Sequence, residues 1–172
     1  MGLTYKSIHV GQIPKLTFGA VNVPIYTSTT YAQVVPDAPL GKWIYTSLGH
    51  PTRNSVERCI ASLENGKYSV LYSSGMSAIS ACLLLLNPGD EVISINDLYG
   101  GTHKNLRDYS APKHILKFTF FDFKDLTKFK SLLNEKVKMV YLESPTNPTL
   151  TVIDVPEVVK VVKITKILIK IF

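Results

Sequence analysis

The sequence has few cysteines and no long apolar run, and both deficits exclude whole classes of protein. Its 172 residues include two cysteines, Cys59 and Cys82, which support neither a zinc site nor a disulfide framework. The most apolar stretch, residues 79–86, is far shorter than the ~20 residues that cross a bilayer. No apolar segment follows Met1, as a signal peptide would require. We therefore expect a cytoplasmic protein with no membrane partner, in which both cysteines are buried.

Two common phosphate-binding signatures are also missing. No Gly-x-Gly-x-x-Gly follows a predicted strand, and no Gly-Lys-Ser or Gly-Lys-Thr phosphate loop occurs. Nicotinamide and nucleotide-triphosphate chemistry therefore lose support. The net charge is +6, but the basic residues are not interleaved with the aromatic side chains of a nucleic-acid stacking surface. We expect a solvated basic face and no nucleic-acid partner.

The composition is that of a globular protein, with 45% hydrophobic and 19% charged residues. Residues 1–53 contain five prolines, which break long regular elements and predict an extended arm that lies over something larger. Regular structure is expected to begin at Asn54, with a helix over residues 54–64 that Gly66 closes. Residues 54–172 form the second predicted domain.

Strand and helix patterns alternate after that helix. Strands are predicted at residues 69–72, 91–95, 115–121 and 137–142, with helices at 76–86, 101–109 and 126–133. This alternation predicts an α/β fold with a mostly parallel sheet covered by helices. Ligands bind outside the carboxyl ends of such strands, so the loops of interest are 73–76, 96–101 and 143–147.

The last fifteen residues have a different pattern. In residues 158–172 lysines recur along one arc of a helix while valines and isoleucines fill the rest. Two interpretations stay open, namely a basic membrane-surface helix and a helix that covers the sheet before an incomplete strand. We favour the second. The lysines concerned are Lys160, Lys163, Lys166 and Lys170.

The turn at 73–76 places a glycine where a strand leads into a helix. The free amides of Gly75 and Met76 can point at an anion, with the helix dipole behind them. Phosphate is the natural candidate, and a tight turn that binds nothing is the alternative.

The other two loops each offer one side chain for a flat polar ligand. Tyr99 projects from a loop with paired glycines and can stack on a ring, or else it covers the edge of the core. Asn147 lies between Pro145 and Pro148, and its amide can contact a ligand or bond to the backbone of its own turn.

These segments, in this order, resemble the pyridoxal-phosphate (PLP) enzymes of cysteine and methionine metabolism, the trans-sulfuration family. The resemblance covers roughly residues 8–157, and within it Pro51–Asn54 and Val152–Asp154 are most similar to cystathionine gamma-lyases. It implies the aspartate-aminotransferase-type fold of PLP-dependent transferases, fold type I, in truncated form. The motifs that carry it are Ile8–Gln12, Val23–Thr30, Gly49–Arg53, Ser73–Met76, Asp97–Gly101 and Glu143–Pro148.

The resemblance also implies a role for five residues. Gly75 and Met76 would hold the cofactor phosphate, Tyr99 would stack on the pyridine ring at the catalytic centre, and Asn147 would contact the ring hydroxyl. Tyr45 would reach the phosphate of a neighbouring subunit. That role implies a homo-oligomer, usually a tetramer in this family, with the proline-rich arm as an intersubunit clasp.

The sequence departs from the family pattern at two positions of the arm. Ser47 stands where an arginine would pair with the neighbour's phosphate, so a bidentate charged contact is lost. His50 stands where asparagine is usual, and either contacts a ligand or bonds to the backbone of its loop.

The resemblance covers less than half of the family's chain. The segments that supply the aspartate at the pyridine nitrogen and the Schiff-base lysine have no counterpart in these 172 residues. By family, the activity is gamma-elimination of cystathionine to cysteine, ammonia and 2-oxobutanoate. The alternatives within the family are the cystathionine gamma-synthase, cystathionine beta-lyase, methionine gamma-lyase and homoserine sulfhydrylase reactions. A further alternative is an inactive fragment that lacks the Schiff-base lysine, produced by truncation or a reading-frame change.

Overall fold

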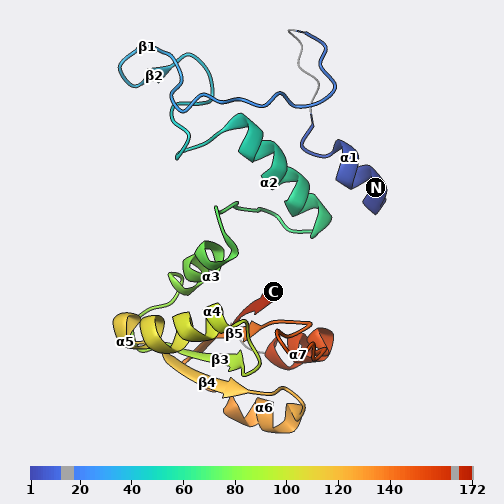
Figure 1. Cartoon of the computed structure of the whole chain (residues 1–172), viewed down its shortest axis with the longest axis vertical. Helices are drawn as coiled ribbons and strands as arrows, with labels where there is room; N and C mark the ends of the chain where they lie inside the picture. The colour runs from blue at the N-terminus through green and yellow to red at the C-terminus, as the bar shows by residue number, and fades with distance from the viewer. Residues whose placement is uncertain (13–17, 164–166, 172) are drawn as a thin grey trace. The chain divides into compact units, whose positions relative to one another are not determined.

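The computed structural model describes residues 1–12, 18–163 and 167–171. These residues form two compact units, residues 1–71 and 72–172 (Figure 1). The arrangement of the fold within each unit positions the candidate site residues.

The first unit is built around two packed helices. It contains α1 (Leu3–His9), β1 (Gln33–Val35), β2 (Ala38–Pro39) and α2 (Pro51–Leu63). The Lys6 ammonium of α1 donates to Ser62 O at 2.9 Å and to Asn65 Oδ1 at 2.7 Å, which fixes the end of α2. Regular structure therefore begins well before Asn54, although the elements between the prolines are short.

The helix expected at 54–64 begins three residues earlier than predicted. His50 is the N-cap and Pro51 occupies the first turn of α2, where a missing N–H costs nothing and the fixed φ favours the helix. The predicted end is confirmed, since Gly66 N donates to Ala61 O at 2.8 Å.

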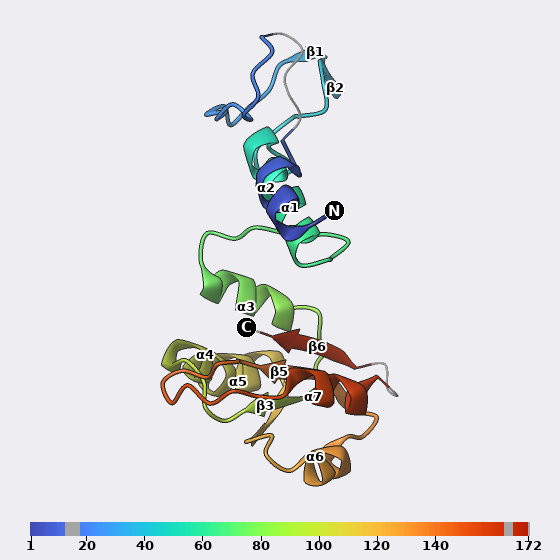
Figure 2. The same cartoon turned by 90° about the vertical axis from the view of Figure 1, so that its right-hand side faces the viewer.

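The second unit is a parallel sheet with helices, which confirms the α/β prediction. Its sheet has the order β4-β3-β5-β6, and every neighbouring pair is parallel. Figure 2 labels three of these strands, β3, β5 and β6. The strands are β3 (Glu91–Ile95), β4 (Lys117–Phe121), β5 (Val137–Leu142) and β6 (Leu168–Ile171). The helices are α3 (Gly75–Leu83), α4 (Gly100–Lys104), the π-helix η1 (Asn105–Ser110), α5 (Ala111–His114), α6 (Leu126–Leu132) and α7 (Val155–Val162).

The helices cover both faces of this sheet. The chain leaves β3 in one direction along the sheet and crosses back to β5 and β6 in the other. Right-handed crossovers then place α4 on one face and α6 and α7 on the other. Consistent with this, α3 contacts α4, and α6 contacts α7. Burial on both faces explains why β3 and β5 are nearly continuous apolar runs, with Val92 and Val140 fully buried.

The predicted strand at 69–72 does not form. These residues have no regular secondary structure and pair with no described strand, and Val70 is 66% exposed. The amide of Leu71 donates instead to Glu57 Oε1 at 3.1 Å. A short extended segment with no neighbour to bond its backbone does not become a strand, whatever its β propensity.

The helix predicted at 101–109 is longer and changes register. After α4 the backbone adopts the wider π spacing, and Ala111 N donates to Leu106 O. Pro112 has no N–H to donate in the next turn. The π turn in η1 lets the helical course continue past that position into α5.

The carboxyl-terminal pattern resolves in favour of a covering helix followed by a strand. α7 packs with Val158 and Val162 buried, and β6 pairs with β5. Lys166 lies outside the described residues. None of the described helices is both long and apolar enough to traverse a membrane.

The aromatic core around Phe129 of α6 predicts a large loss of stability for one substitution. Phe129 of α6 is fully buried, and its ring centroid lies 4.9 Å from that of Phe123 and 6.4 Å from that of Phe121. We expect Phe129→Ala to lower the free energy of unfolding by about 3 kcal/mol or more, because a cavity replaces the ring. Denaturant unfolding followed by circular dichroism measures the change.

The exposed neighbour Lys130 provides the control on the same helix. Lys130→Ala is expected to stay within about 0.5 kcal/mol of the parent chain. Equal effects of the two substitutions would contradict the packing described for α6.

Candidate cofactor-binding site

The first turn of α3 presents free backbone donors. Ser74 caps the helix, since its hydroxyl accepts from Ser77 N at 3.1 Å. The amides of Gly75 and Met76 have no acceptor within the described residues. A Cβ built on Gly75 meets nothing within 4 Å, so the space beside these amides is open. The turn thus has the donors and the room that an anion requires.

Tyr99 is held at the start of α4 with half of its surface exposed. Its backbone amide donates to Glu143 Oε2 at 3.2 Å. Its ring lies so close to Gly101 that a Cβ there would be 2.5 Å from Cε1. The second glycine of the pair is therefore needed for the position of the ring, whereas a Cβ on Gly100 meets nothing within 4 Å.

Asn147 lies on a loop that other residues fix. Thr146 N donates to Thr151 O at 2.9 Å, and Leu150 N donates to Thr146 O at 2.9 Å. The side chain of Asn147 is exposed and makes no hydrogen bond to the described residues. The alternative in which it bonds to its own turn is absent there, so its amide is free for a ligand.

A cavity of about 350 Å³ lies beside Tyr99. Residues of α3, α4 and β5 and the loop after β5 line it, namely Ile79, Tyr99, Thr102, Tyr141, Glu143, Ser144 and Pro145. Thr102 Oγ1 lies 3.9 Å from Met76 Sδ, which joins the first turns of α3 and α4. Burial raises the pKa of Tyr141, so its phenol is neutral at physiological pH.

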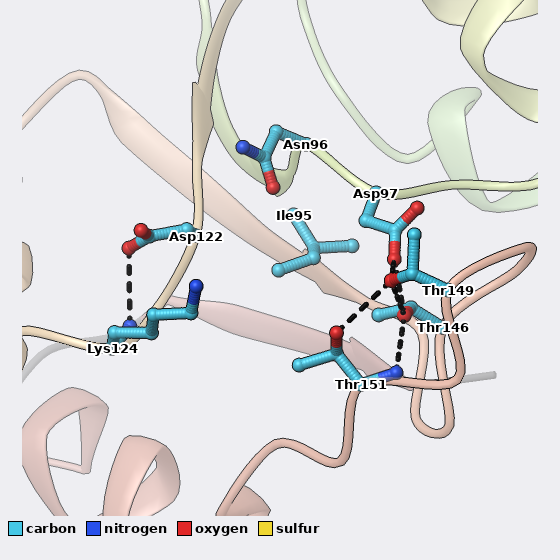
Figure 3. A pocket seen from close by; sticks show the side chains of 8 residues that line it. All are labelled: Ile95, Asn96, Asp97, Asp122, Lys124, Thr146, Thr149 and Thr151. Carbon is cyan, nitrogen blue, oxygen red and sulfur yellow. Dashed lines mark hydrogen bonds between the residues drawn. The ribbon is translucent and has the colours of Figure 1, made fainter.

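A second, more polar cavity of about 400 Å³ lies at the same edge of the sheet (Figure 3). Asp97 lies on its wall and accepts hydrogen bonds from the hydroxyls of Thr146 and Thr149. These bonds, that of Thr146 first, lower the pKa of Asp97 and favour its carboxylate form. On the opposite wall Asp122 Oδ1 accepts from Lys124 N at 3.1 Å.

The remaining predicted residues belong to the first unit. Tyr45 is 46% exposed, and its backbone bridges to Thr30. Ser47 lines a cavity of about 480 Å³ together with Arg53. The ring of His50 packs edge-on against Tyr31 at 6.4 Å between centroids, while its backbone begins α2.

Neither thiols nor metal ligands gather in the described part of the chain. Cys59 and Cys82 are free, and each is partly rather than fully buried. Across residues 1–12, 18–163 and 167–171, no group of three His, Cys, Asp or Glu side chains could hold a metal ion.

Comparison with known proteins identifies the family of the chain. The model of the Cys/Met metabolism PLP-dependent enzyme family covers residues 4–171. The chain belongs to this family. It is 43% identical over 148 residues to the cystathionine beta-lyase of Coxiella burnetii, and 42% identical over 143 residues to the cystathionine gamma-lyase of Dictyostelium discoideum. These matches cover 84% and 83% of this chain and 37% of each relative.

Solved structures that superpose on this chain confirm the fold. A crystal structure of metB from Corynebacterium glutamicum superposes with a TM-score of 0.93 at 33% identity. That of the cystathionine gamma-lyase from Lactobacillus plantarum in complex with L-serine superposes with a TM-score of 0.91 at 33% identity. Each match covers 99% of this chain and 44% of the other. The chain therefore spans less than half the length of the relatives it matches.

The donor set of the second unit suits the family's cofactor. Free amides at a helix start suit a phosphate ester, an exposed phenol ring suits a flat heteroaromatic ring, and a free carboxamide suits a ring hydroxyl. The first turns of α3 and α4 and the loops after β3 and β5 meet at one edge of the sheet. The individual roles of Gly75, Met76, Tyr99, Asn147 and Tyr45 stay predictions.

The sequence pattern missed the residues that hold these loops together. Asp97, Thr146 and Thr149 lie inside the motifs, but no period or spacing pairs side chains about fifty positions apart. The available signal is a carboxylate two residues after a buried strand and three threonines after the next strand in the sheet.

The cap of α3 generates a testable prediction for this site. Ser74→Ala removes the acceptor of the Ser77 amide, so we expect the free energy of unfolding to fall by about 1 kcal/mol. Ser74→Thr keeps the hydroxyl and should retain most of that stability. Thermal unfolding of both variants measures the difference, and a melting temperature unchanged by Ser74→Ala would show that the cap is not needed.

Proposed function

We propose that this chain is the part of a PLP-dependent trans-sulfuration enzyme that holds the cofactor phosphate and ring. The parent reaction is gamma-elimination of cystathionine to cysteine, ammonia and 2-oxobutanoate. The observation that carries the proposal is the convergence of the α3 amino end, the Tyr99 ring and the loop after β5 at one edge of a parallel sheet. Ligands of open α/β sheets bind at that edge.

Each group at this edge has a distinct task in the proposal. The amides of Gly75 and Met76 bind the phosphate dianion, which the α3 dipole also attracts. Tyr99 presents the face of its ring to the pyridine, and Asn147 donates to or accepts from the ring hydroxyl. When bound, the cofactor supplies an electron sink for bond cleavage in the amino acid.

A second candidate is cofactor binding without turnover. One observation favours it: none of the seven residues that line the cavity beside Tyr99 is a lysine. An amine that binds the cofactor and moves protons is needed for the elimination. In this candidate the chain docks on a full-length subunit or binds PLP alone.

Binding to the purified chain tests the proposal. We expect equilibrium dialysis to show phosphate-dependent uptake of PLP and no uptake of pyridoxal at the same concentration. Release of 2-oxobutanoate from cystathionine supports the lyase, and uptake without release supports the second candidate. Absence of PLP uptake would contradict both the lyase and PLP binding by the chain alone.

Paired glycine variants test the stacking role of Tyr99 within that experiment. Gly101→Ala forces the Tyr99 ring to move, and the dissociation constant of PLP should rise about fivefold, which corresponds to ~1 kcal/mol of ring stacking. Gly100→Ala meets open space and should bind PLP like the parent chain. Equal affinities of the two variants would contradict a stacking role.

We also propose that Tyr45 completes the phosphate site of a second copy of the chain. Its hydroxyl makes no hydrogen bond within the part of the chain that the structure describes, and its side chain is exposed. Oligomers with shared sites place such groups in the partner's site.

A phenylalanine pair tests that proposal. Tyr45→Phe removes only the hydroxyl, so the dissociation constant of PLP should rise several-fold while sedimentation shows unchanged assembly. The same change at the exposed Tyr68 should leave both unchanged. A monomeric parent chain that binds PLP, or a Tyr45→Phe variant with unchanged affinity, would contradict the role of Tyr45.

A further inference from the structure

Two carboxylates tie the Tyr99 loop (residues 96–99) to the Asn147 loop (residues 143–151). Asp97, on the first loop, accepts from the Thr146 and Thr149 hydroxyls of the second. Glu143, on the second loop, accepts from Tyr99 N at 3.2 Å. Each loop therefore supplies a carboxylate that accepts from the other loop, and neither loop can move far without breaking these bonds.

The Asp97 side of this connection is an ordered network (Figure 3). The hydroxyl of Thr146, a fully buried residue, also accepts from Thr151 N at 2.8 Å. Thr149 Oγ1 lies 3.0 Å from Thr151 Oγ1. Charge-assisted bonds from two hydroxyls to one carboxylate are stronger than neutral ones, so Asp97 is the centre of the network.

The position of Asn147 follows from this network. Its own side chain bonds to none of the described residues, and it lies between the two threonines that donate to Asp97. Asp97 in turn is two residues before Tyr99 on the chain. One carboxylate therefore holds the backbone on both sides of Asn147 and lies next to the turn that carries Tyr99.

We propose that Asp97 is a positioning residue that fixes Asn147 relative to Tyr99, so that the two loops form one unit. The expected effect on PLP affinity rests on the proposed function, in which Tyr99 and Asn147 together contact the flat ring of the cofactor. Preorganisation of this kind raises affinity by removing the cost of ordering loops on binding.

The test uses the full chain with three aspartate variants, Asp97→Ala, Asp97→Asn and Asp122→Asn. Asp122 is the matched control, since its carboxylate lines the same cavity but, among the described residues, accepts only from the nearby Lys124 amide. Amide hydrogen exchange is followed at Tyr99 N, Thr146 N, Leu150 N and Thr151 N, which are all bonded in the parent chain.

We expect Asp97→Ala to raise exchange about tenfold or more at all four amides, including the one on the Tyr99 loop. The dissociation constant of PLP should rise about tenfold in parallel. Asp97→Asn should have a smaller effect, because it keeps one acceptor oxygen, and Asp122→Asn should change neither quantity. Faster exchange at Thr146, Leu150 and Thr151 but not at Tyr99 would overturn the proposal. Asp97 would then stabilise only the Asn147 loop.

Two further outcomes are decided by the same measurements. If the parent chain takes up no PLP, the proposed function fails, while exchange at the four amides still supports or overturns the coupling of the loops. If Asp97→Ala unfolds the chain, variants of the exposed Thr149 test the proposal instead. Thr149→Val should raise exchange at Tyr99 N several-fold and Thr149→Ser should not, and equal exchange in the two variants would overturn the proposal.

Discussion

The parallel pairing of β3 with both β4 and β5 is the constraint on which the rest of the second unit depends. Parallel strands bring their carboxyl ends to one edge, so the loops that follow β3 and β5 start as neighbours although about fifty residues separate them. Asp97 can reach Thr146 only because the two strands run in the same direction and in register, with Ile93 opposite Val140. The register of the sheet thus brings together the side chains of the candidate site.

That edge of the sheet carries two carboxylates as well as free amide donors. Asp97 and Glu143 are bonded to hydroxyl and amide donors on the facing loops, which satisfies their acceptors locally. The amides of Gly75 and Met76, in contrast, have no described acceptor, and they lie at the positive end of α3. The negative groups hold the loops together while the free donors remain for a ligand.

The pattern of apolar residues correctly predicted the strands that are buried on both faces of the sheet. It failed where strand formation depends on a neighbouring strand that the local sequence does not reveal. Strands 91–95 and 137–142 form with the predicted bounds because their continuous apolar runs fit only a covered sheet. Residues 69–72 were predicted as a strand but have no described partner, so they form no regular structure and are mostly exposed. The loops after β3 and β5 were predicted from strand ends, but the bond from the Thr146 hydroxyl to Asp97 depends on side-chain pairing that no local pattern encodes.

Two relatives of this chain are named for different reactions on cystathionine. The beta-lyase and the gamma-lyase among the relatives are almost equally similar to this chain, at 43% and 42% identity, although their names differ in the carbon at which cleavage occurs. A segment that matches both to the same degree favours neither reaction over the other. Phosphate and ring binding is the shared requirement, because the electron sink serves either bond cleavage. The choice of bond then depends on the groups that position the substrate side chain and move its protons.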